Sequence, residues 1–338
     1  MAKNGDMPNF PPRNSYAGSR VMVTGGLGFI GSNLALRLAA EGAEVVILDN
    51  LMPDYGGNMA NIAGFGDRLR VNIADLRDRQ ALRVLVPGQD VIFNLAGQIG
   101  HLASMQDPFT DLDINAAAQL GLLETCRALN PSVRIVYAST RQIYGKPDRL
   151  PVDEDHPLRP VDVNGINKIA GETYHLLYHR VYGLQTVALR LTNTYGPRMR
   201  IRDERQTFVG IWLRRVLEGG SFEIWGGEQR RDLAYVDDVV DAFLAAASVP
   251  AAIGQVFNIG GSPPIKLIEL AEMLVALAGA GGFERKQFPA ERKRIDIGEY
   301  WADDRRFRSV TGWAPCVDLD DGLRRSIDYY RAHFAAYA

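Results

Sequence analysis

The chain has 338 residues, of which 46% are hydrophobic and 23% are charged, and its formal net charge is -2. This composition excludes a disordered chain and supports one large hydrophobic core or two smaller ones. The near balance of acids and bases leaves no electrostatic footprint for nucleic acid or an anionic membrane, so neither partner is expected. No apolar run approaches the roughly 20 residues of a membrane span and no signal-peptide core is visible, so we expect a cytoplasmic protein.

The first half of the chain alternates short apolar runs with helical patterns. Strands are predicted at 20–26, 43–50, 69–75, 90–97 and 133–140, with helices at 33–42, 79–88 and 113–129. This alternation is typical of βαβ units around a parallel sheet. Because the strand runs contain few polar residues, helices should cover both faces of the sheet. The predicted fold class is therefore α/β, a Rossmann-type doubly wound parallel sheet.

A glycine-rich turn follows the first predicted strand. Gly25, Gly28 and Gly31 lie between this strand and the next helix, and Asp49 ends the second strand. Glycines permit a tight turn and let backbone amides approach a pyrophosphate at the positive end of a helix dipole. A carboxylate about 20 residues later can accept hydrogen bonds from an adenosine ribose and repels a 2′-phosphate. The sequence therefore predicts an NAD site rather than an NADP site.

The pattern loosens beyond Tyr144. A Pro- and charge-rich segment at 145–160 indicates a surface loop, and a helix at about 164–182 and a strand at 185–193 follow it. The last third has fewer strand signals. We predict a Rossmann domain over 18–190 with parts of 230–260, and a smaller, discontinuous C-terminal α/β lobe over most of 191–338.

The cysteines and one acidic pair give no metal pattern. Cys126 and Cys316 lack metal-ligand spacing and are expected to be separate buried thiols. Asp237 and Asp238 begin a helical pattern, where carboxylates favour the N-terminal dipole, so we predict a structural role for both. No metal is expected.

The motifs TGGLGFIG, DNL, NLAG, YAST...YG, LRLTNTYGP and RDLAYVDDVVDA together resemble the extended short-chain dehydrogenase/reductase family that acts on nucleotide sugars. The resemblance spans almost the whole chain after about residue 20. It implies an N-terminal NAD-binding domain, a C-terminal substrate-binding lobe that closes over a nucleoside diphosphate sugar, and a homodimer built on the helices at 112–129 and 164–182. The implied activity is that of an epimerase, dehydratase or decarboxylase.

The resemblance also implies which residues bind each ligand. Besides the glycine turn and Asp49, the residues expected to bind the cofactor are Phe29, Ile30, Asn50, Asp75, Leu76, Leu95, Ala96, Gly97, Asn115 and Lys168. The substrate is expected at Gln98, Arg141, Asn193, Arg231 and Arg294. Arginines suit the substrate pyrophosphate because the guanidinium fork binds phosphate oxygens in a bidentate manner.

The catalytic positions depart from the family pattern. Family members use a tyrosine and a lysine four residues apart, which lie on one helix face, together with a serine or threonine after the preceding strand. Thr140 and Lys168 match this pattern, but Asn164 stands where the tyrosine is expected. An amide cannot take a proton from a hydroxyl in this pH range. The simple family mechanism should therefore be badly impaired unless another group replaces the tyrosine.

Three interpretations remain open. His101, in the loop after the fourth predicted strand, can replace the base, because histidine titrates near neutrality; Tyr144 and Tyr195 are weaker candidates. A water held by Asn164 and Lys168 can carry the proton instead. In the third interpretation the site is redox-silent, and the protein only binds NAD and a sugar nucleotide. An asparagine introduced to trap a complex would give the same sequence.

Arg141 and Gln142 narrow the expected reaction. Family 4,6-dehydratases carry an Asp–Glu pair at these two positions, and arginine and glutamine can replace neither the acid nor the base. Decarboxylases usually carry Ser–Glu there, so Gln142 also counts against decarboxylation. We therefore predict an NAD-dependent nucleotide-sugar epimerase, which needs only transient oxidation of a sugar hydroxyl and re-reduction of the other ketone face. Dehydration is the less favoured alternative.

Overall fold

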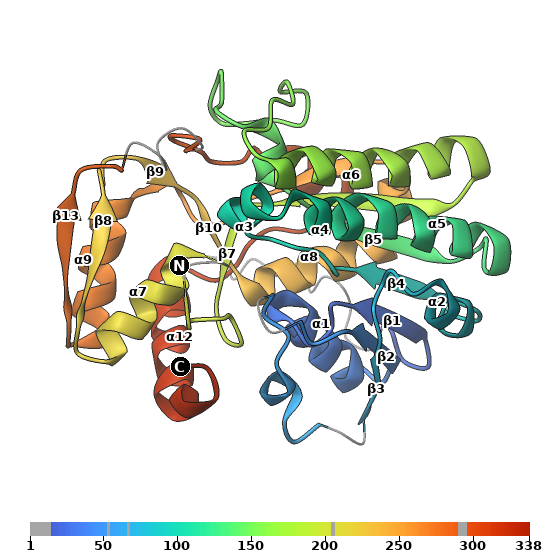
Figure 1. Ribbon diagram of the computed structural model, residues 1–338, viewed down its shortest axis with the longest axis horizontal. Coiled ribbons are helices and arrows are strands. Elements are labelled where there is room, and N and C mark those ends of the chain that lie inside the picture. The colour runs from blue at the N-terminus through green and yellow to red at the C-terminus, as the bar shows by residue number, and fades with distance from the viewer. Residues whose placement is uncertain (1–14, 53–54, 66–67, 204–206, 290–295) are drawn as a thin grey trace, which may run out of the picture.

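A seven-stranded parallel sheet forms the centre of the molecule (Figure 1). The computed structural model describes residues 15–52, 55–65, 68–203, 207–289 and 296–338. The sheet order is β11-β6-β5-β4-β1-β2-β3. Its strands are β1 (Arg20–Thr24), β2 (Glu44–Asp49), β3 (Leu69–Ile73), β4 (Val91–Asn94), β5 (Arg134–Thr140), β6 (Gln185–Leu191) and β11 (Val256–Ile259). Because β1 lies between β2 and β4, the strand order reverses there and opens a crevice at the carboxyl ends of these strands.

Helices cover both faces of this sheet. One face carries α1 (Phe29–Ala40) and α8 (Val236–Ser248), and the other carries α2 (Arg79–Leu85), α5 (Ala118–Leu129) and α6 (Val163–Tyr182). Within β1, Val21 and Val23 pack toward α1 and α8, whereas Met22 packs toward α2 and α5. Both alternate sets of side chains are thus buried, which is why the strands read as apolar runs. The prediction of a doubly wound α/β fold is confirmed.

Two helix beginnings differ from the predictions. The helix predicted at 33–42 starts at Phe29, because the glycine turn runs directly into it. The helix predicted at 113–129 begins earlier, because a π-helical turn (Asp113–Ala117) joins α5 without a gap to the helical residues 108–112. Two short helices come before that turn, α3 (His101–Gln106) and α4 (Pro108–Leu112). A proline at the first position of α4 restarts the chain after Asp107, which the apolar periodicity does not reveal.

A smaller lobe is built from the C-terminal part of the chain. Its helices and strands are α7 (Phe208–Leu217), α9 (Leu267–Ala278), α12 (Leu319–His333), β8 (Ser221–Trp225) and β13 (Gly282–Lys286). Trp212, Phe222 and Leu270 belong to its own hydrophobic core. Since α8 and β11 return to the main sheet between these elements, the lobe is discontinuous. The division at residue 190 stays a prediction.

Short elements complete the description. The two-stranded sheets are β7 (Asn193–Tyr195) with β10 (Leu233–Tyr235) and β9 (Arg230–Arg231) with β12 (Ile265–Lys266). The remaining helix is α11 (Arg305–Thr311), and the 3-10 turns are η1 (Met59–Ile62), η4 (Arg141–Tyr144), η5 (Pro250–Ala252) and η6 (Phe334–Ala336). Among the described helices, none is both long and apolar enough to cross a membrane.

The cysteine prediction is partly wrong. Both thiols are free, and Cys126 is buried, but Cys316 is exposed because it lies in the irregular segment before α12. Its thiol donates to a carboxylate oxygen of Asp238, 3.1 Å away. Asp237 and Asp238 do lie in the first turn of α8, as expected. In the described part of the chain, no three His, Cys, Asp or Glu side chains gather as a metal site.

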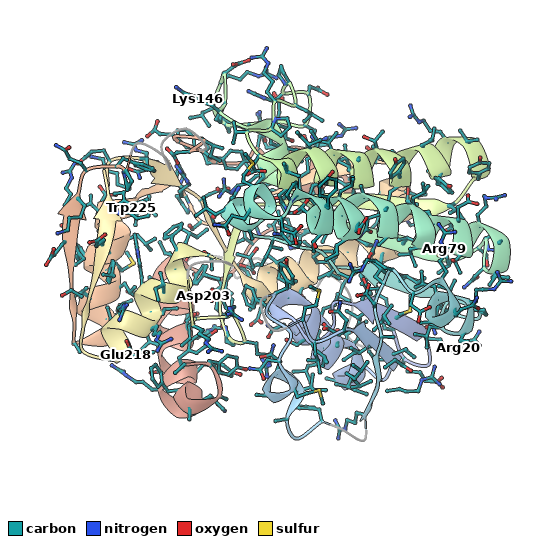
Figure 2. All side chains as sticks on the ribbon, viewed as in Figure 1. Arg20, Arg79, Lys146, Asp203, Glu218 and Trp225 are labelled. Carbon is teal, nitrogen blue, oxygen red and sulfur yellow. The ribbon has the colours of Figure 1, made fainter. Side chains whose placement is uncertain are left out.

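Charged side chains of both signs lie at the outer surface in the view of Figure 2. The labelled residues Arg20, Arg79, Lys146 and Glu218 are exposed, each on a different segment. The surface in this view therefore agrees with the balanced composition.

His175 makes the fold sensitive to acid. It is fully buried on α6, donates from Nδ1 to the Gly171 carbonyl and stacks on Tyr137. Burial lowers the pKa of His175 from 6.5 to about 4. The histidine of the unfolded chain therefore binds a proton more readily than that of the folded chain. Its contribution to the free energy of unfolding is fully present above pH 6.5 and is lost as the pH falls toward 4, by about 1.4 kcal/mol per pH unit.

Urea unfolding at pH 7.5 and pH 5 measures this loss. We expect the free energy of unfolding to fall more steeply on acidification in the wild type than in a His175→Gln variant. Parallel pH dependence in the two proteins would contradict the assignment.

Candidate active site

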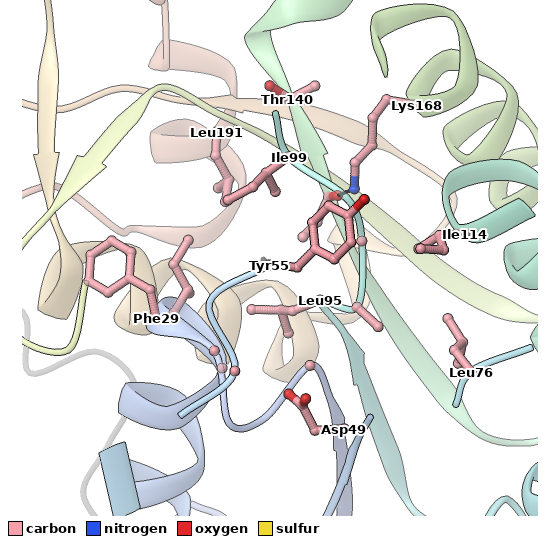
Figure 3. Close-up of a pocket in the computed structure, with 18 of the residues that line it drawn as sticks. Phe29, Asp49, Tyr55, Leu76, Leu95, Ile99, Ile114, Thr140, Lys168 and Leu191 are labelled. Carbon is pink, nitrogen blue, oxygen red and sulfur yellow. Dashed lines mark hydrogen bonds between the residues drawn. The ribbon is translucent and has the colours of Figure 1, made fainter. Parts of the chain in front are cut away.

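A single cavity lies at the carboxyl ends of the sheet strands (Figure 3). Thr140 and Lys168 lie at one end of the view, and Asp49 and Leu76 lie at the other. The predicted residues that line the cavity are Gly25, Gly28, Phe29, Ile30, Gly31, Asp49, Asn50, Asp75, Leu76, Leu95, Ala96, Gly97, Thr140, Arg141, Asn164, Lys168 and Asn193. Four further predicted residues, Gln98, His101, Asn115 and Arg231, are not among its lining residues, and Arg294 lies outside the described residues.

The glycine turn is packed so closely against backbone atoms that larger residues do not fit. A Cβ added at Gly31 would lie 2.2 Å from the Gly25 carbonyl oxygen, and one at Gly25 would lie 2.9 Å from the Ala96 nitrogen. Gly25 also has φ of 68°, a conformation that favours glycine. Helix α1 has no side-chain cap at Gly28 and no acidic residue in its first turn. Its positive end is thus available to an anion such as a pyrophosphate.

Acidic side chains lie at the ends of β2 and β3. The Asp49 carboxylate accepts from the backbone amides of Leu27 at 3.0 Å and Leu51 at 2.9 Å, which fixes its position on the cavity wall. Burial raises the pKa of Asp49. Asn50 donates to Asp75 at 2.7 Å, and hydrogen bonds from Arg77 are the main reason that the pKa of Asp75 falls to about 2. This wall presents oxygens suited to ribose hydroxyls and an adenine amine.

Lys168 reaches the other end of the cavity from α6. Its Nζ donates to the Ala138 carbonyl at 3.1 Å, and burial lowers the pKa of Lys168 to about 8. A Cβ at Gly97 would lie 2.9 Å from this Nζ, so the glycine allows the lysine to approach. Thr140 ends β5, and its hydroxyl accepts from the Gln142 amide at 3.3 Å. Both predicted catalytic side chains therefore face the same cavity.

Asn164 is held by a buried carboxylate that sequence reasoning missed. Its Nδ2 donates to the Gln98 carbonyl oxygen at 2.7 Å, the Gln98 side-chain oxygen at 3.0 Å and Asp111 at 2.9 Å. The other Asp111 oxygen accepts from Asn167 at 2.8 Å, and Asp111 is completely buried. A carboxylate buried among amide donors matches an asparagine and would not be satisfied by an aromatic ring.

His101 is held by a second carboxylate. Its Nδ1 lies against Asp162 and its Nε2 lies against the Gln142 side-chain nitrogen, both in short contacts. An ionised carboxylate only accepts, so the proton lies on Nδ1, and Nε2 then carries the lone pair that accepts from Gln142. Asp162 also caps α6 by accepting from Gly165 at 2.7 Å. Because Gln142 lines the cavity, His101 lies directly behind its wall.

The weaker candidates for the base are packed away from the cavity. Tyr144 is fully buried and donates to Asn258 at 2.7 Å, and Tyr195 is buried against Tyr235. Neither is among the cavity-lining residues. Burial raises the pKa of Tyr144 to about 12, which makes it a poor proton acceptor at neutral pH.

The predicted substrate residues differ in their placement. Arg141 and Asn193 line the cavity, and Arg141 donates to the Asn193 side-chain oxygen at 2.9 Å. Arg231 is buried and lies 3.4 Å from Asp296; burial lowers the pKa of Arg231 to about 10. Gln98 is buried and bound to Asn164 and Gly100. Its predicted contact with the sugar stays a prediction.

Several site residues had no sequence signal. Tyr55, Ile99 and Thr207 line the cavity from irregular segments without a recognised motif. Asp111 meets Asn164 only because α4 packs on α6. Asp162 was detectable as a helix cap, since it precedes the helix predicted at about 164, but its contact with His101 was not.

The cavity fits NAD. The glycine turn with the uncapped start of α1 suits the pyrophosphate, Asp49 suits the adenosine ribose, and Lys168 suits the nicotinamide ribose. Asn115 has a buried side-chain oxygen without a partner among the described residues, and it faces Gly97 at the same end as Lys168. A hydroxyl donor bound there would satisfy it.

Comparisons with known proteins agree with this geometry. The model of the NAD dependent epimerase/dehydratase family matches residues 21–260. A UDP-glucose 4-epimerase from Mycolicibacterium smegmatis is 35% identical, and the match covers 92% of this chain and 98% of the relative. The UDP-glucose 4-epimerase structure from Thermotoga maritima, solved with UDP-glucose, has a TM-score of 0.84 at 29% identity, over 93% of this chain and 99% of that one. The structure of a dTDP-glucose 4,6-dehydratase from Streptomyces venezuelae, solved with NAD, has a TM-score of 0.86 at 28% identity. The match covers 94% of this chain and 98% of that one.

Proposed function

Because the chain belongs to the NAD dependent epimerase/dehydratase family, whose cofactor is NAD, we propose that it is an epimerase of nucleoside diphosphate sugars. The observation that carries the proposal is one cavity lined by the glycine turn, Thr140, Lys168 and Asn193. Arg141 and Gln142 can provide neither the acid nor the base of a dehydration. Epimerisation does not need an acid and a base at these two positions, so it is favoured over dehydration.

The side chains of the cavity divide the work of the reaction. Bound NAD supplies a reversible hydride acceptor. Thr140 holds the reacting sugar hydroxyl by a hydrogen bond, and the buried Lys168 ammonium holds positive charge beside it, which favours loss of the hydroxyl proton. Asn164 cannot accept that proton, since its amide is bound to Asp111 and Gln98.

His101 is the proton acceptor in this proposal. The hydroxyl proton passes to the Nε2 lone pair and returns from it when the ketone is reduced on its other face. For this transfer the substrate hydroxyl displaces the Gln142 amide, which Nε2 contacts without substrate. Asp162 stabilises the imidazolium formed and fixes its ring orientation.

Product analysis tests the proposed function. The purified full chain is incubated with NAD and UDP-linked hexoses and hexuronates, and the products are separated by chromatography and weighed by mass spectrometry. An epimerase gives a new peak of unchanged mass, whereas a dehydratase gives a product lighter by one water. Tight binding of a sugar nucleotide without any conversion would favour the redox-silent binding protein.

Restoring the family tyrosine should not activate the protein. The Asn164→Tyr variant leaves Asp111 without one of its two amide donors and forces a ring into a buried position, so we expect the free energy of unfolding to fall by about 1–3 kcal/mol, with no gain in turnover. Urea unfolding and turnover measure both effects. The double variant with Asp111→Asn removes the buried charge and should recover part of the stability.

A large gain in turnover with Asn164→Tyr would have the opposite meaning. It would show that the native site lacks a base, and His101 would no longer be needed as the acceptor. A water held by Asn164 and Lys168 is the alternative route if Asn164→Tyr abolishes turnover while a change at His101 leaves it unaltered.

We also expect a homodimer. Apolar side chains are exposed on the neighbouring helices α4, α5 and α6, including Phe109, Ile166 and Val181, which are 76%, 56% and 58% exposed. Exposed apolar side chains on neighbouring helices favour association in water. The family resemblance makes a second copy of the chain the expected partner for these helices.

A further inference from the structure

Arg141 carries a buried hydrogen-bond donor with nothing to bind. Its Nη1 is shielded from solvent and has no hydrogen-bond partner among the described residues. Its Nη2 has one neutral acceptor, the Asn193 side-chain oxygen at 2.9 Å, and the guanidinium lies over the Tyr300 ring at 5.3 Å. An arginine offers five donors, and leaving a buried one unpaired costs free energy. The arrangement is therefore incomplete without a ligand.

No carboxylate of the described residues forms an ion pair with Arg141. The buried Asp232 lies close enough to favour the charged guanidinium, but its oxygens accept from the Thr192 hydroxyl and the Ala302 amide. Asp296 is 3.4 Å from Arg231 instead. Burial lowers the pKa of Arg141, and the nearby carboxylates of Asp232, Asp296 and Asp162 offset this loss of water only in part. An anion brought by the ligand would supply the missing partner.

Two further residues of the cavity wall carry buried polar atoms without a partner among the described residues. The Asn193 side-chain oxygen accepts from Arg141, and its Nδ2 has no hydrogen-bond partner among the described residues. The hydroxyl of Thr207 also has none among them. Arg141, Asn193 and Thr207 all line the cavity. The unpaired nitrogen of the Arg141 guanidinium, beside the Asn193 amide, is suited to a group with at least two anionic oxygens.

The place of Arg141 in the sequence indicates that its anionic partner belongs to the sugar of the substrate. It follows Thr140 directly, at the carboxyl end of β5, so its guanidinium belongs to the end of the cavity where the reacting hydroxyl is held. We propose that the substrate sugar carries a carboxylate and that Arg141, with Asn193, binds it. This inference rests on the proposed function and narrows its substrate to nucleoside diphosphate uronic acids.

Binding measurements on the full chain with NAD test the inference without requiring turnover. The probes are UDP, UDP-glucose and UDP-glucuronate, titrated by calorimetry. We expect the wild type to bind UDP-glucuronate about 10- to 100-fold more tightly than UDP-glucose, from the charge-assisted hydrogen bonds. Arg141→Gln should abolish this preference, so that the affinity for UDP-glucuronate falls by a much larger factor than the affinities for UDP and UDP-glucose. Retained UDP binding also shows that the variant is folded.

The matched control is Arg159→Gln, since Arg159 is exposed and pairs with Asp148 at the surface. It should keep the preference for UDP-glucuronate. If Arg141→Gln weakens all three ligands by the same factor, Arg141 binds the diphosphate and the inference is wrong. A wild type without preference for UDP-glucuronate overturns it as well. Failure of the wild type to bind any of the three, UDP included, contradicts the proposed function itself.

Discussion

Replacing His101 by glutamine is expected to lower the turnover of the proposed epimerisation by about 100- to 10,000-fold, the usual contribution of general acid–base catalysis. Glutamine keeps a hydrogen-bonding group beside Asp162 and Gln142 but cannot accept the proton of the sugar hydroxyl. Because His101 lies behind the cavity wall, binding of NAD and of UDP should not change. Turnover and calorimetric binding, measured on the same preparation, separate the two effects.

His333→Gln is the matched control for this variant. His333 is exposed at the end of α12, where it donates to the Tyr329 carbonyl of its own helix and stacks on the Tyr329 ring. Its replacement should leave turnover unchanged. If His101→Gln retains full turnover, another group or a bound water takes the proton, and the role assigned to Asp162 fails with it.

The second large effect is expected at the glycine turn. Gly31→Ala should weaken NAD binding by about 10- to 100-fold and lower the free energy of unfolding by about 1–3 kcal/mol. The added Cβ would lie 2.2 Å from the Gly25 carbonyl oxygen, and backbone cannot move aside as a flexible side chain can. The turn must open, which displaces the amides that face the pyrophosphate. Calorimetric titration with NAD and urea unfolding measure the two losses.

Gly121→Ala is the control for the glycine substitution. Gly121 lies within α5, where the only atom close to an added Cβ is the Arg79 Nε at 4.0 Å. Alanine is a better helix former than glycine, so this variant should be as stable as the wild type or more so. Equal NAD affinity in the Gly31→Ala variant and the wild type would show that the turn does not hold the pyrophosphate.

The parts of the fold that could be predicted are those with local causes. Strands such as β1 are apolar because both sheet faces are covered, and that pattern is visible in a few consecutive residues. The glycine turn and Asp49 keep a fixed spacing because one βαβ unit holds them together. The assignment of Thr140 and Lys168 follows from the family resemblance, which relies on local motifs at a strand end and on one helix.

The contacts that could not be predicted join distant segments. Asp111 reaches Asn164 across the packing of α4 on α6, and an isolated aspartate in a sequence gives no sign of its partner. The contact between His101 and Asp162 depends on how α3 lies against α6. The early helix start at Pro108 and the π-helical turn before α5 are features that an apolar periodicity averages over. Tertiary packing decides each of these.

The buried contact between Asp111 and Asn164 has a consequence for how this site can change over generations. A single mutation to tyrosine at 164 leaves a carboxylate short of a donor, and a single apolar replacement of Asp111 leaves the buried Asn167 amide short of an acceptor. Each first step toward the usual tyrosine site is therefore unfavourable alone, although both together need not be. Lineages that acquired this pair would tend to keep it, and their proton chemistry would evolve around it.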